Sequence, residues 1–176
     1  DQLKKFRAMG GAQSYPSRTK DLDGVDFSTG SVGLGVAVTL FASLIQDYLE
    51  VKSMLPSENK VARMVALMGD AELDEGNVWE AMLEGWKHDV RNLWWIIDYN
   101  RQSLDSTVSD KLFGRFDDIF KTTGWNVITL KYGKKLQSLQ DVSGGEALLN
   151  WIDECPNSLY SALTYKGGEG FKKRIK

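Results

Sequence analysis

The feature that most constrains the fold is a stretch in which two short apolar runs flank a helical pattern. The runs, RMVALM at 63–68 and LWWIIDYN at 93–100, have the length and composition of buried strands. Between them, apolar side chains recur at helical spacing: Trp79, Met82, Leu83 and Trp86. Crossovers of this kind are almost always right-handed, so the strands are parallel and their carboxyl ends share one edge. The pattern therefore predicts a parallel α/β unit.

Polar residues stand at both of these strand ends. Gly69-Asp70 follows the first run, and Asn100 ends the second. Carboxylate and amide oxygens suit Mg²⁺ or Ca²⁺, and Mg²⁺ commonly completes its coordination with water and a bound phosphate. The amino end of the following helix favours an anion. We therefore predict a magnesium-diphosphate site, although Asp is also a common helix cap and Asn a common turn residue.

The same stretch resembles the cofactor motif of thiamine diphosphate enzymes. That motif is Gly-Asp-Gly followed further along the chain by Asn, and this chain has Gly69-Asp70-Ala71 and Asn100. Within the transketolase-like superfamily, the chain is most similar to the decarboxylating component of single-chain (homodimeric) pyruvate dehydrogenase. The segments that carry this similarity are QSYPSR at 13–18, TGSVGLG at 29–35, GDAELDEG at 69–76, DYNRQSLD at 98–105 and IFKTTGWNVI at 119–128.

The resemblance implies which residues hold the cofactors, thiamine diphosphate and Mg²⁺. Asp70 and Asn100 would bind Mg²⁺ through their side chains, and Gln102 through its backbone carbonyl. The diphosphate would lie against the backbone of Gly69, Ala71 and Glu72.

The resemblance also implies two contacts to the rest of the cofactor. Gly30 would offer its carbonyl to the aminopyrimidine, and Val32 would be the apolar wedge that keeps the cofactor bent. Val32 is smaller than the Leu or Met usual in the family. Ala71 replaces the third glycine of the motif, which is tolerable only if its φ is negative, because a Cβ at positive φ costs on the order of 1 kcal/mol.

The implied fold is a three-layer α/β/α domain with a mostly parallel sheet, the diphosphate-binding domain of the thiamine diphosphate-binding fold, here incomplete. We expect an arm and active-site loop at 1–28, the diphosphate-binding domain at 29–165 and a basic tail at 166–176. The family's glutamate from the pyrimidine-binding domain and its substrate histidines are absent, so no catalytic residue is assigned.

The implied function is the diphosphate and magnesium-binding part of an oxidoreductase that decarboxylates pyruvate and passes the acyl group to lipoamide. The chain would be inactive alone. Its partners would be a pyrimidine-binding domain, a second copy in a homodimer and a lipoyl acyltransferase. A transketolase acting on sugar phosphates and a non-catalytic dimerisation or scaffold domain are the alternatives, and Ala71 favours the second.

Two glycine-rich segments precede the first strand. The first 31 residues have a short helical start and then a long loop rich in Gly, Ser, Pro and Asp. The resemblance implies that Ser14, Tyr15 and Pro16 lie near the cofactor entrance; the alternative is a surface arm. The pattern at 29–35 opens a helix running to about Leu49 and is not a dinucleotide-binding fingerprint, so close helix packing is the simpler explanation.

The predicted helix at 77–88 carries two tryptophans and the chain's single histidine. The spacing of Trp79 and Trp86 is typical of a core stripe. The resemblance implies instead that both side chains belong to a dimer face. His88 stands at the carboxyl end of the helix, where a cation is favoured without any catalytic role.

Composition excludes several classes. The formal net charge is −2 without a basic stripe, which argues against nucleic acid as a partner. Cys155 is alone, which excludes an internal disulfide and fits a cytoplasmic location. The apolar stretch at 33–45 is too short for a membrane span.

The rest of the chain shows weaker patterns. We expect a turn at 55–60, a helix ending at Gly124, a third strand at 125–130, a loop at 131–145 and a short amphipathic helix at 145–156.

Overall fold

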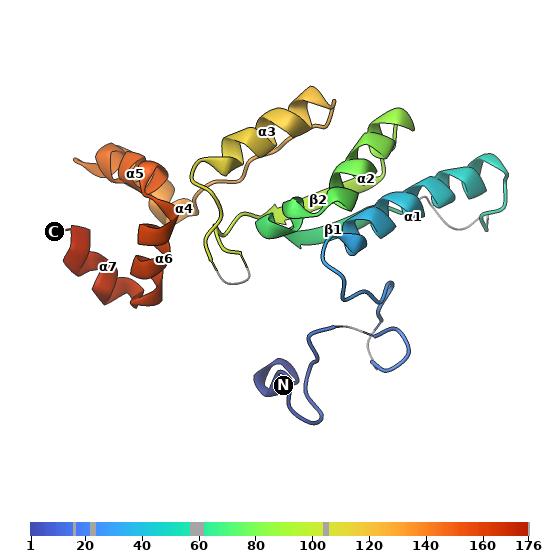
Figure 1. Cartoon of the computed structure of the whole chain (residues 1–176), viewed down its shortest axis with the longest axis horizontal. Coiled ribbons are helices and arrows are strands. Elements are labelled where there is room, and N and C mark those ends of the chain that lie inside the picture. The colour runs from blue at the N-terminus through green and yellow to red at the C-terminus, as the bar shows by residue number, and fades with distance from the viewer. Residues whose placement is uncertain (16, 22–23, 57–61, 104–105, 176) are drawn as a thin grey trace. The chain divides into compact units, whose positions relative to one another are not determined.

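The protein is described by a computed structural model that covers residues 1–15, 17–21, 24–56, 62–103 and 106–175 (Figure 1). Pro16 and residues 57–60 of the predicted turn lie outside the described residues. The chain forms two compact units, Asp1–Asp98 and Tyr99–Lys176.

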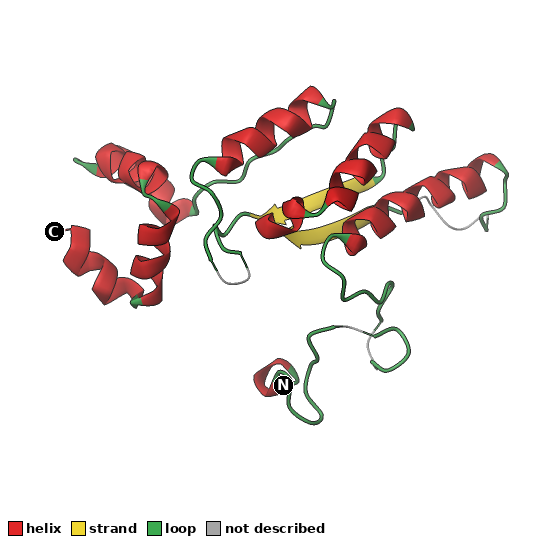
Figure 2. Ribbon diagram, in the orientation of Figure 1, coloured by secondary structure: helices red, strands yellow, loops and turns green. Residues whose placement is uncertain are grey.

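The first unit contains the predicted parallel α/β motif. Its strands are β1 (Met64–Gly69) and β2 (Leu93–Asp98), which pair in parallel from Met64 opposite Leu93 to Gly69 opposite Asp98. A short 3-10 helix, η2 (Asp70–Asp74), follows β1, and α2 (Gly76–Lys87) leads to β2 (Figure 2). The remaining elements are η1 (Leu3–Lys5) and α1 (Leu34–Val51). The prediction of two parallel strands around a helix is therefore confirmed.

The core of this unit lies on one face of the two-stranded sheet. Alternate strand residues, including Ala66, Met68 and Leu93, are buried, and α1 packs on both strands and on α2. The helices contribute the buried side chains of Val36, Leu40, Val78, Ala81 and Met82. The other face remains exposed and is formed by Val65, Leu67, Trp94 and Ile96. Burial on one face follows from the two-residue period of a strand.

Gly33 precedes helix α1 as its N-cap residue, and its φ of 76° is in the left-handed region. It has 18 residues, longer than the predicted apolar stretch, and by length and composition it could cross a membrane. The argument from length against a membrane span is therefore wrong. Helices in the cores of water-soluble proteins meet the same criterion, and α1 packs on β1 and α2.

The second unit is helical. It contains α3 (Leu112–Thr122), α4 (Lys134–Gln137), η3 (Ser138–Asp141), α5 (Gly145–Glu154), α6 (Asn157–Tyr165) and α7 (Gly167–Ile175). Helix α3 ends shortly before Gly124, as predicted, whereas the predicted loop at 131–145 contains α4 and η3. The expected tail is helical over α7, and the predicted domain boundaries stay a prediction.

The predicted third strand is wrong. Residues 125–130 form no strand in the part of the chain that the structure describes, and Leu130 is 93% exposed. A β-branched, apolar sequence favours extended backbone, but a strand also needs a neighbour to accept its hydrogen bonds. The chain as a whole is thus a mixed α/β protein with a small two-stranded parallel sheet.

Candidate functional site

Asp70 lies at the carboxyl end of β1, at the start of η2. Its side chain is 1% exposed, and its Oδ1 accepts a hydrogen bond from the backbone N–H of Ala71 at 3.0 Å. Burying a carboxylate costs free energy unless hydrogen bonds or a cation compensate. The sequence-predicted metal ligand is thus a buried carboxyl group at a strand end, where ligands bind in α/β proteins.

Ala71, which replaces the third glycine of the motif, meets the condition that its φ must not be positive. It lies inside η2, and it is not among the described residues with positive φ. Its Cβ therefore causes no left-handed strain, and the backbone of this turn accommodates alanine as readily as glycine.

Glu72 connects two segments of the first unit that are far apart in sequence. Its Oε1 accepts a hydrogen bond from the N–H of Gly69 at 3.2 Å, and its Oε2 accepts one from the N–H of Gly33 at 2.9 Å. The side chain of Glu72 therefore ties the turn after β1 to the start of α1. Sequence reasoning assigned only the backbone of this residue to the site.

The loop that leads into α1 carries the other predicted cofactor contacts. Gly30 is exposed, and a Cβ at this position would lie 2.9 Å from the ring of Tyr15. Tyr15, predicted near the cofactor entrance, therefore packs against a predicted cofactor contact. Val32 is 47% exposed, so an apolar side chain is available at the predicted wedge position. The Oγ1 of Thr29 is buried and has no hydrogen-bond partner among the described residues.

Asn100 and Gln102 belong to the second unit, whereas Asp70 belongs to the first. Since Asp98 pairs with Gly69, the two segments that carry the predicted ligands leave the sheet at the same edge. The Oδ1 of Asn100 accepts the backbone N–H of Gln102 at 2.9 Å, which is an Asx turn. The joint ligand set of Asp70, Asn100 and Gln102 stays a prediction.

Arg101, between these two predicted ligands, is a residue that sequence reasoning missed. Its guanidinium donates to the carbonyls of Ile152 at 3.3 Å and Cys155 at 3.4 Å, and lies 4.4 Å from the ring centroid of Tyr160. The carboxyl end of a helix favours a cation. Arg101 therefore fastens the Asn100–Gln102 turn to α5 and α6. The only sequence signal is a basic residue inside the motif, and it does not indicate these partners.

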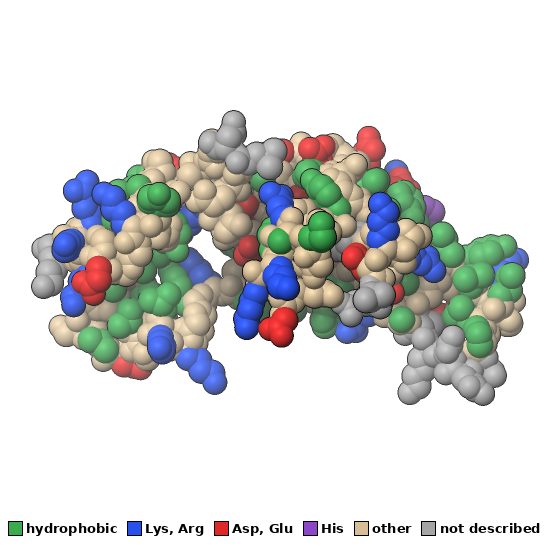
Figure 3. Space-filling view, turned by 90° about the horizontal axis from the view of Figure 1, so that it is seen from below, with side chains coloured by type: hydrophobic (Ala, Val, Ile, Leu, Met, Phe, Trp, Pro, Cys, Tyr) green, Lys and Arg blue, Asp and Glu red, His purple; other side chains and the backbone are tan. Residues whose placement is uncertain are grey.

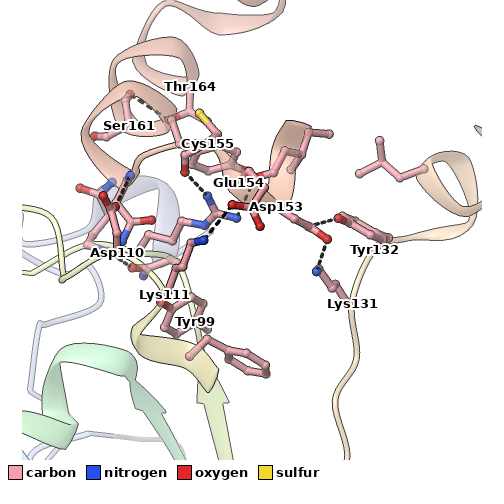
Figure 4. Close-up of a pocket in the computed structure, with 18 of the residues that line it drawn as sticks. Tyr99, Asp110, Lys111, Lys131, Tyr132, Asp153, Glu154, Cys155, Ser161 and Thr164 are labelled. Atoms are coloured by element: carbon pink, nitrogen blue, oxygen red, sulfur yellow. Dashed lines mark hydrogen bonds and ion pairs between the residues drawn. The ribbon is translucent and has the colours of Figure 1, made fainter. Parts of the chain in front are cut away.

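These contacts belong to a hollow of the second unit with a volume of about 1130 Å³ (Figure 4). On its wall, Lys111 pairs with Glu154 at 2.8 Å, and Asp153 accepts hydrogen bonds from Lys131 and Tyr132. Burial, followed by the hydrogen bond to Asp153, raises the pKa of Tyr132 to about 12. Burial would raise the pKa of Asp153 as well, but hydrogen bonds from Lys131 and Tyr132 hold it below its usual range.

Two other predictions concern α2. His88 caps the carboxyl end of the helix, as predicted, and lies on the surface 3.4 Å from Glu84 (Figure 3). The indole of Trp79 donates to the carbonyl of Leu73 at 2.8 Å, whereas Trp86 is exposed. The two tryptophans are therefore not equally buried, and a dimer face at this helix stays a prediction.

The chain belongs to the family of transketolase thiamine diphosphate binding domains, which it matches over residues 1–144. Its relatives include the pyruvate dehydrogenase E1 components of Cupriavidus necator, 30% identical over 175 residues, and Mycolicibacterium smegmatis, 29% identical over 177 residues. The matched regions cover 96% and 97% of this chain but 19% of each relative. The resemblance inferred from the motifs is thereby confirmed.

Asp70 of the first unit provides a buried carboxyl group, which is a type of ligand that suits a hard cation. Gly30 is exposed, and a Cβ at this position would meet the ring of Tyr15 at 2.9 Å. No group of three or more His, Cys, Asp or Glu side chains that could hold a metal occurs among the described residues. A cation at Asp70 would therefore need oxygens from other sources, as Mg²⁺ does when it binds together with a phosphate.

Proposed function

We propose that this chain is the diphosphate- and magnesium-binding part of a thiamine diphosphate-dependent 2-oxo acid dehydrogenase. The complete protein would decarboxylate pyruvate and pass the acyl group to lipoamide. The chain alone would bind cofactor without turning over substrate. The observation that carries the proposal is the buried carboxylate of Asp70 at the end of β1, within a chain of the thiamine diphosphate binding family.

In this proposal the chain's residues bind and orient the cofactor. Asp70, Asn100 and the carbonyl of Gln102 hold Mg²⁺, while the backbone of Gly69, Ala71 and Glu72 faces the diphosphate. The carbonyl of Gly30 and the side chain of Val32 set the position of the aminopyrimidine. Bound thiamine diphosphate supplies the carbanion-stabilising chemistry that decarboxylation needs. The similarity of the chain to pyruvate dehydrogenase E1 components supports these assignments.

The exposed face of the sheet supports our proposal of a three-layer fold in which further helices cover that face. Purely parallel sheets normally have both faces covered. Here Val65, Leu67, Trp94 and Ile96 form an exposed apolar face, while the buried strand residues lie on the face where α1 packs. We propose that additional helices of the complete protein cover this face. A pyrimidine-binding domain, a second copy and a lipoyl acyltransferase remain its proposed partners, and its proposed location is the cytoplasm.

Calorimetric titration with thiamine diphosphate tests the binding proposal. We expect binding to the 176-residue chain in the presence of Mg²⁺ and its loss on addition of a chelator. Asp70→Asn preserves the shape of the side chain but removes its charge, and should abolish binding. The matched control is Asp74→Asn, because Asp74 is an exposed carboxylate at the end of the same 3-10 helix. Equal affinity of the Asp70→Asn variant and the wild type would refute the metal assignment.

The choice between reactions needs the complete protein. We expect it to release CO₂ from pyruvate and not to transfer two-carbon units from a ketose phosphate. The reverse result would favour the transketolase alternative. Ala71 no longer favours a non-catalytic scaffold, because its backbone conformation carries no penalty for a side chain.

A further inference from the structure

Glu72 uses both oxygens of one carboxylate on two different segments. The bonds to the N–H groups of Gly69 and Gly33 measure 3.2 and 2.9 Å, and the second spans 39 residues of sequence. Hydrogen bonds to a charged acceptor are stronger than those between neutral groups. The arrangement therefore joins the turn that carries Asp70 to the loop that carries Gly30 and Val32.

Both donors stand at helix starts that have no side chain of their own for capping. Gly69 precedes η2, and Gly33 precedes α1. Glutamate three residues after a cap residue commonly reaches back to the cap N–H, which is the bond to Gly69. The additional bond to Gly33 places the same negative charge beside the amino end of an 18-residue helix, where the helix dipole favours an anion.

A second observation shows that the loop before α1 is closely packed at Gly33, whose N–H group donates to Glu72. A Cβ at Gly33 would lie 2.8 Å from Oδ1 of Asn77, 2.9 Å from Cβ of Glu75 and 3.0 Å from Cγ2 of Val78. The backbone at Gly33 is thus packed against the start of α2 while its N–H is held by Glu72. The end of the loop before α1 therefore contacts the start of α2 and is hydrogen-bonded to the turn after β1.

We propose that Glu72 is a positioning residue that sets the distance between the two predicted cofactor-contact segments, 30–32 and 69–71. This inference rests on the proposed function and adds a role for the side chain of Glu72 beside that of its backbone. Without the carboxylate, the metal-binding turn and the aminopyrimidine loop would each keep their local conformation but lose their fixed separation. Cofactor affinity should then fall although Asp70 is unchanged.

The test compares Glu72→Gln with Glu80→Gln in the 176-residue chain. Both variants remove one negative charge with little change of size, and Glu80 is exposed on α2. The amide of Gln can accept through its oxygen only, so its NH₂ group would face one of the two N–H donors. We expect the amide protons of Gly33 or Gly69 to exchange at least about tenfold faster in Glu72→Gln without cofactor, as measured by NMR.

The second measurement is calorimetric affinity for thiamine diphosphate with Mg²⁺, at a temperature where circular dichroism shows both variants folded. We expect affinity to fall about tenfold in Glu72→Gln, equivalent to ~1.4 kcal/mol, and to stay unchanged in Glu80→Gln. A purely structural role would lower the melting temperature without this selective loss of affinity.

The outcomes separate this inference from the proposed function. Exchange rates at Gly33 and Gly69 that match those of Glu80→Gln would overturn the inference, and so would faster exchange with unchanged affinity. If the wild-type chain binds no cofactor, the proposed function of this chain fails. The exchange measurement still decides whether Glu72 holds the two segments together.

Discussion

Gly33 is the position in the first unit where an added methyl group should destabilise the fold most, so Gly33→Ala tests the packing around the site. Two costs contribute to the expected loss of stability. The residue has a φ of 76°, and an L side chain in the left-handed region costs about 1–2 kcal/mol. The new Cβ would also lie 2.8–3.0 Å from Asn77, Glu75 and Val78, and overpacking of this kind costs about 1–3 kcal/mol. We therefore expect the free energy of unfolding to fall by about 2–5 kcal/mol.

Urea unfolding followed by far-UV circular dichroism measures this loss, and two control glycines separate its terms. Gly69 has a φ of −80° and nothing within 4 Å of an added Cβ, so Gly69→Ala should change the free energy of unfolding by less than about 1 kcal/mol. Gly144 has a φ of 80° and equally open space, so Gly144→Ala should cost the backbone term alone. A Gly33→Ala variant as stable as Gly69→Ala would refute the packing of α1 against the start of α2.

Two further predictions concern the sheet and the second unit. Met68 is 1% exposed, whereas Leu67 is 75% exposed. Met68→Ala should therefore lower the free energy of unfolding, measured in urea, by about 2–5 kcal/mol, and Leu67→Ala should lower it by well under half of that. Equal losses would contradict a core on one face of the sheet. The folded pKa of Tyr132 is raised from 10.0 to about 12, so the stabilisation from its protonated hydroxyl is complete below pH 10 and is lost as the pH rises through 12. The absorbance difference between wild type and Tyr132→Phe should therefore titrate near pH 12, and titration near pH 10 would argue against the bond to Asp153.

The parts of the fold that were predictable from sequence are those that depend on local patterns. Apolar runs of strand length and a helical stripe between them predicted β1, α2, β2 and their parallel order, because period and crossover handedness are local or nearly universal rules. The position of Asp70 directly after the carboxyl end of β1 followed from the same rules.

Long-range contacts were not predictable in this way. The bond from Glu72 to Gly33 joins residues 39 positions apart, and the contacts of Arg101 with α5 and α6 span more than fifty positions of sequence. The periodicity of a sequence does not indicate such pairs. The prediction of a strand at 125–130 was wrong for a related reason: its residues have high β-propensity, but propensity does not provide the neighbouring strand that would accept its hydrogen bonds.

Ala71 shows how a departure from a motif is best judged. Glycine is required where φ is positive or where a Cβ would collide, and in this site both conditions hold at Gly33. Neither the 3-10 conformation of residue 71 nor its surroundings demand glycine, since the backbone there lies outside the left-handed region. Alanine therefore stands at a position where the geometry permits a side chain, and glycine stands at the position where the geometry requires it. The departure from the motif at Ala71 thus gives no physical reason to expect a distorted turn after β1.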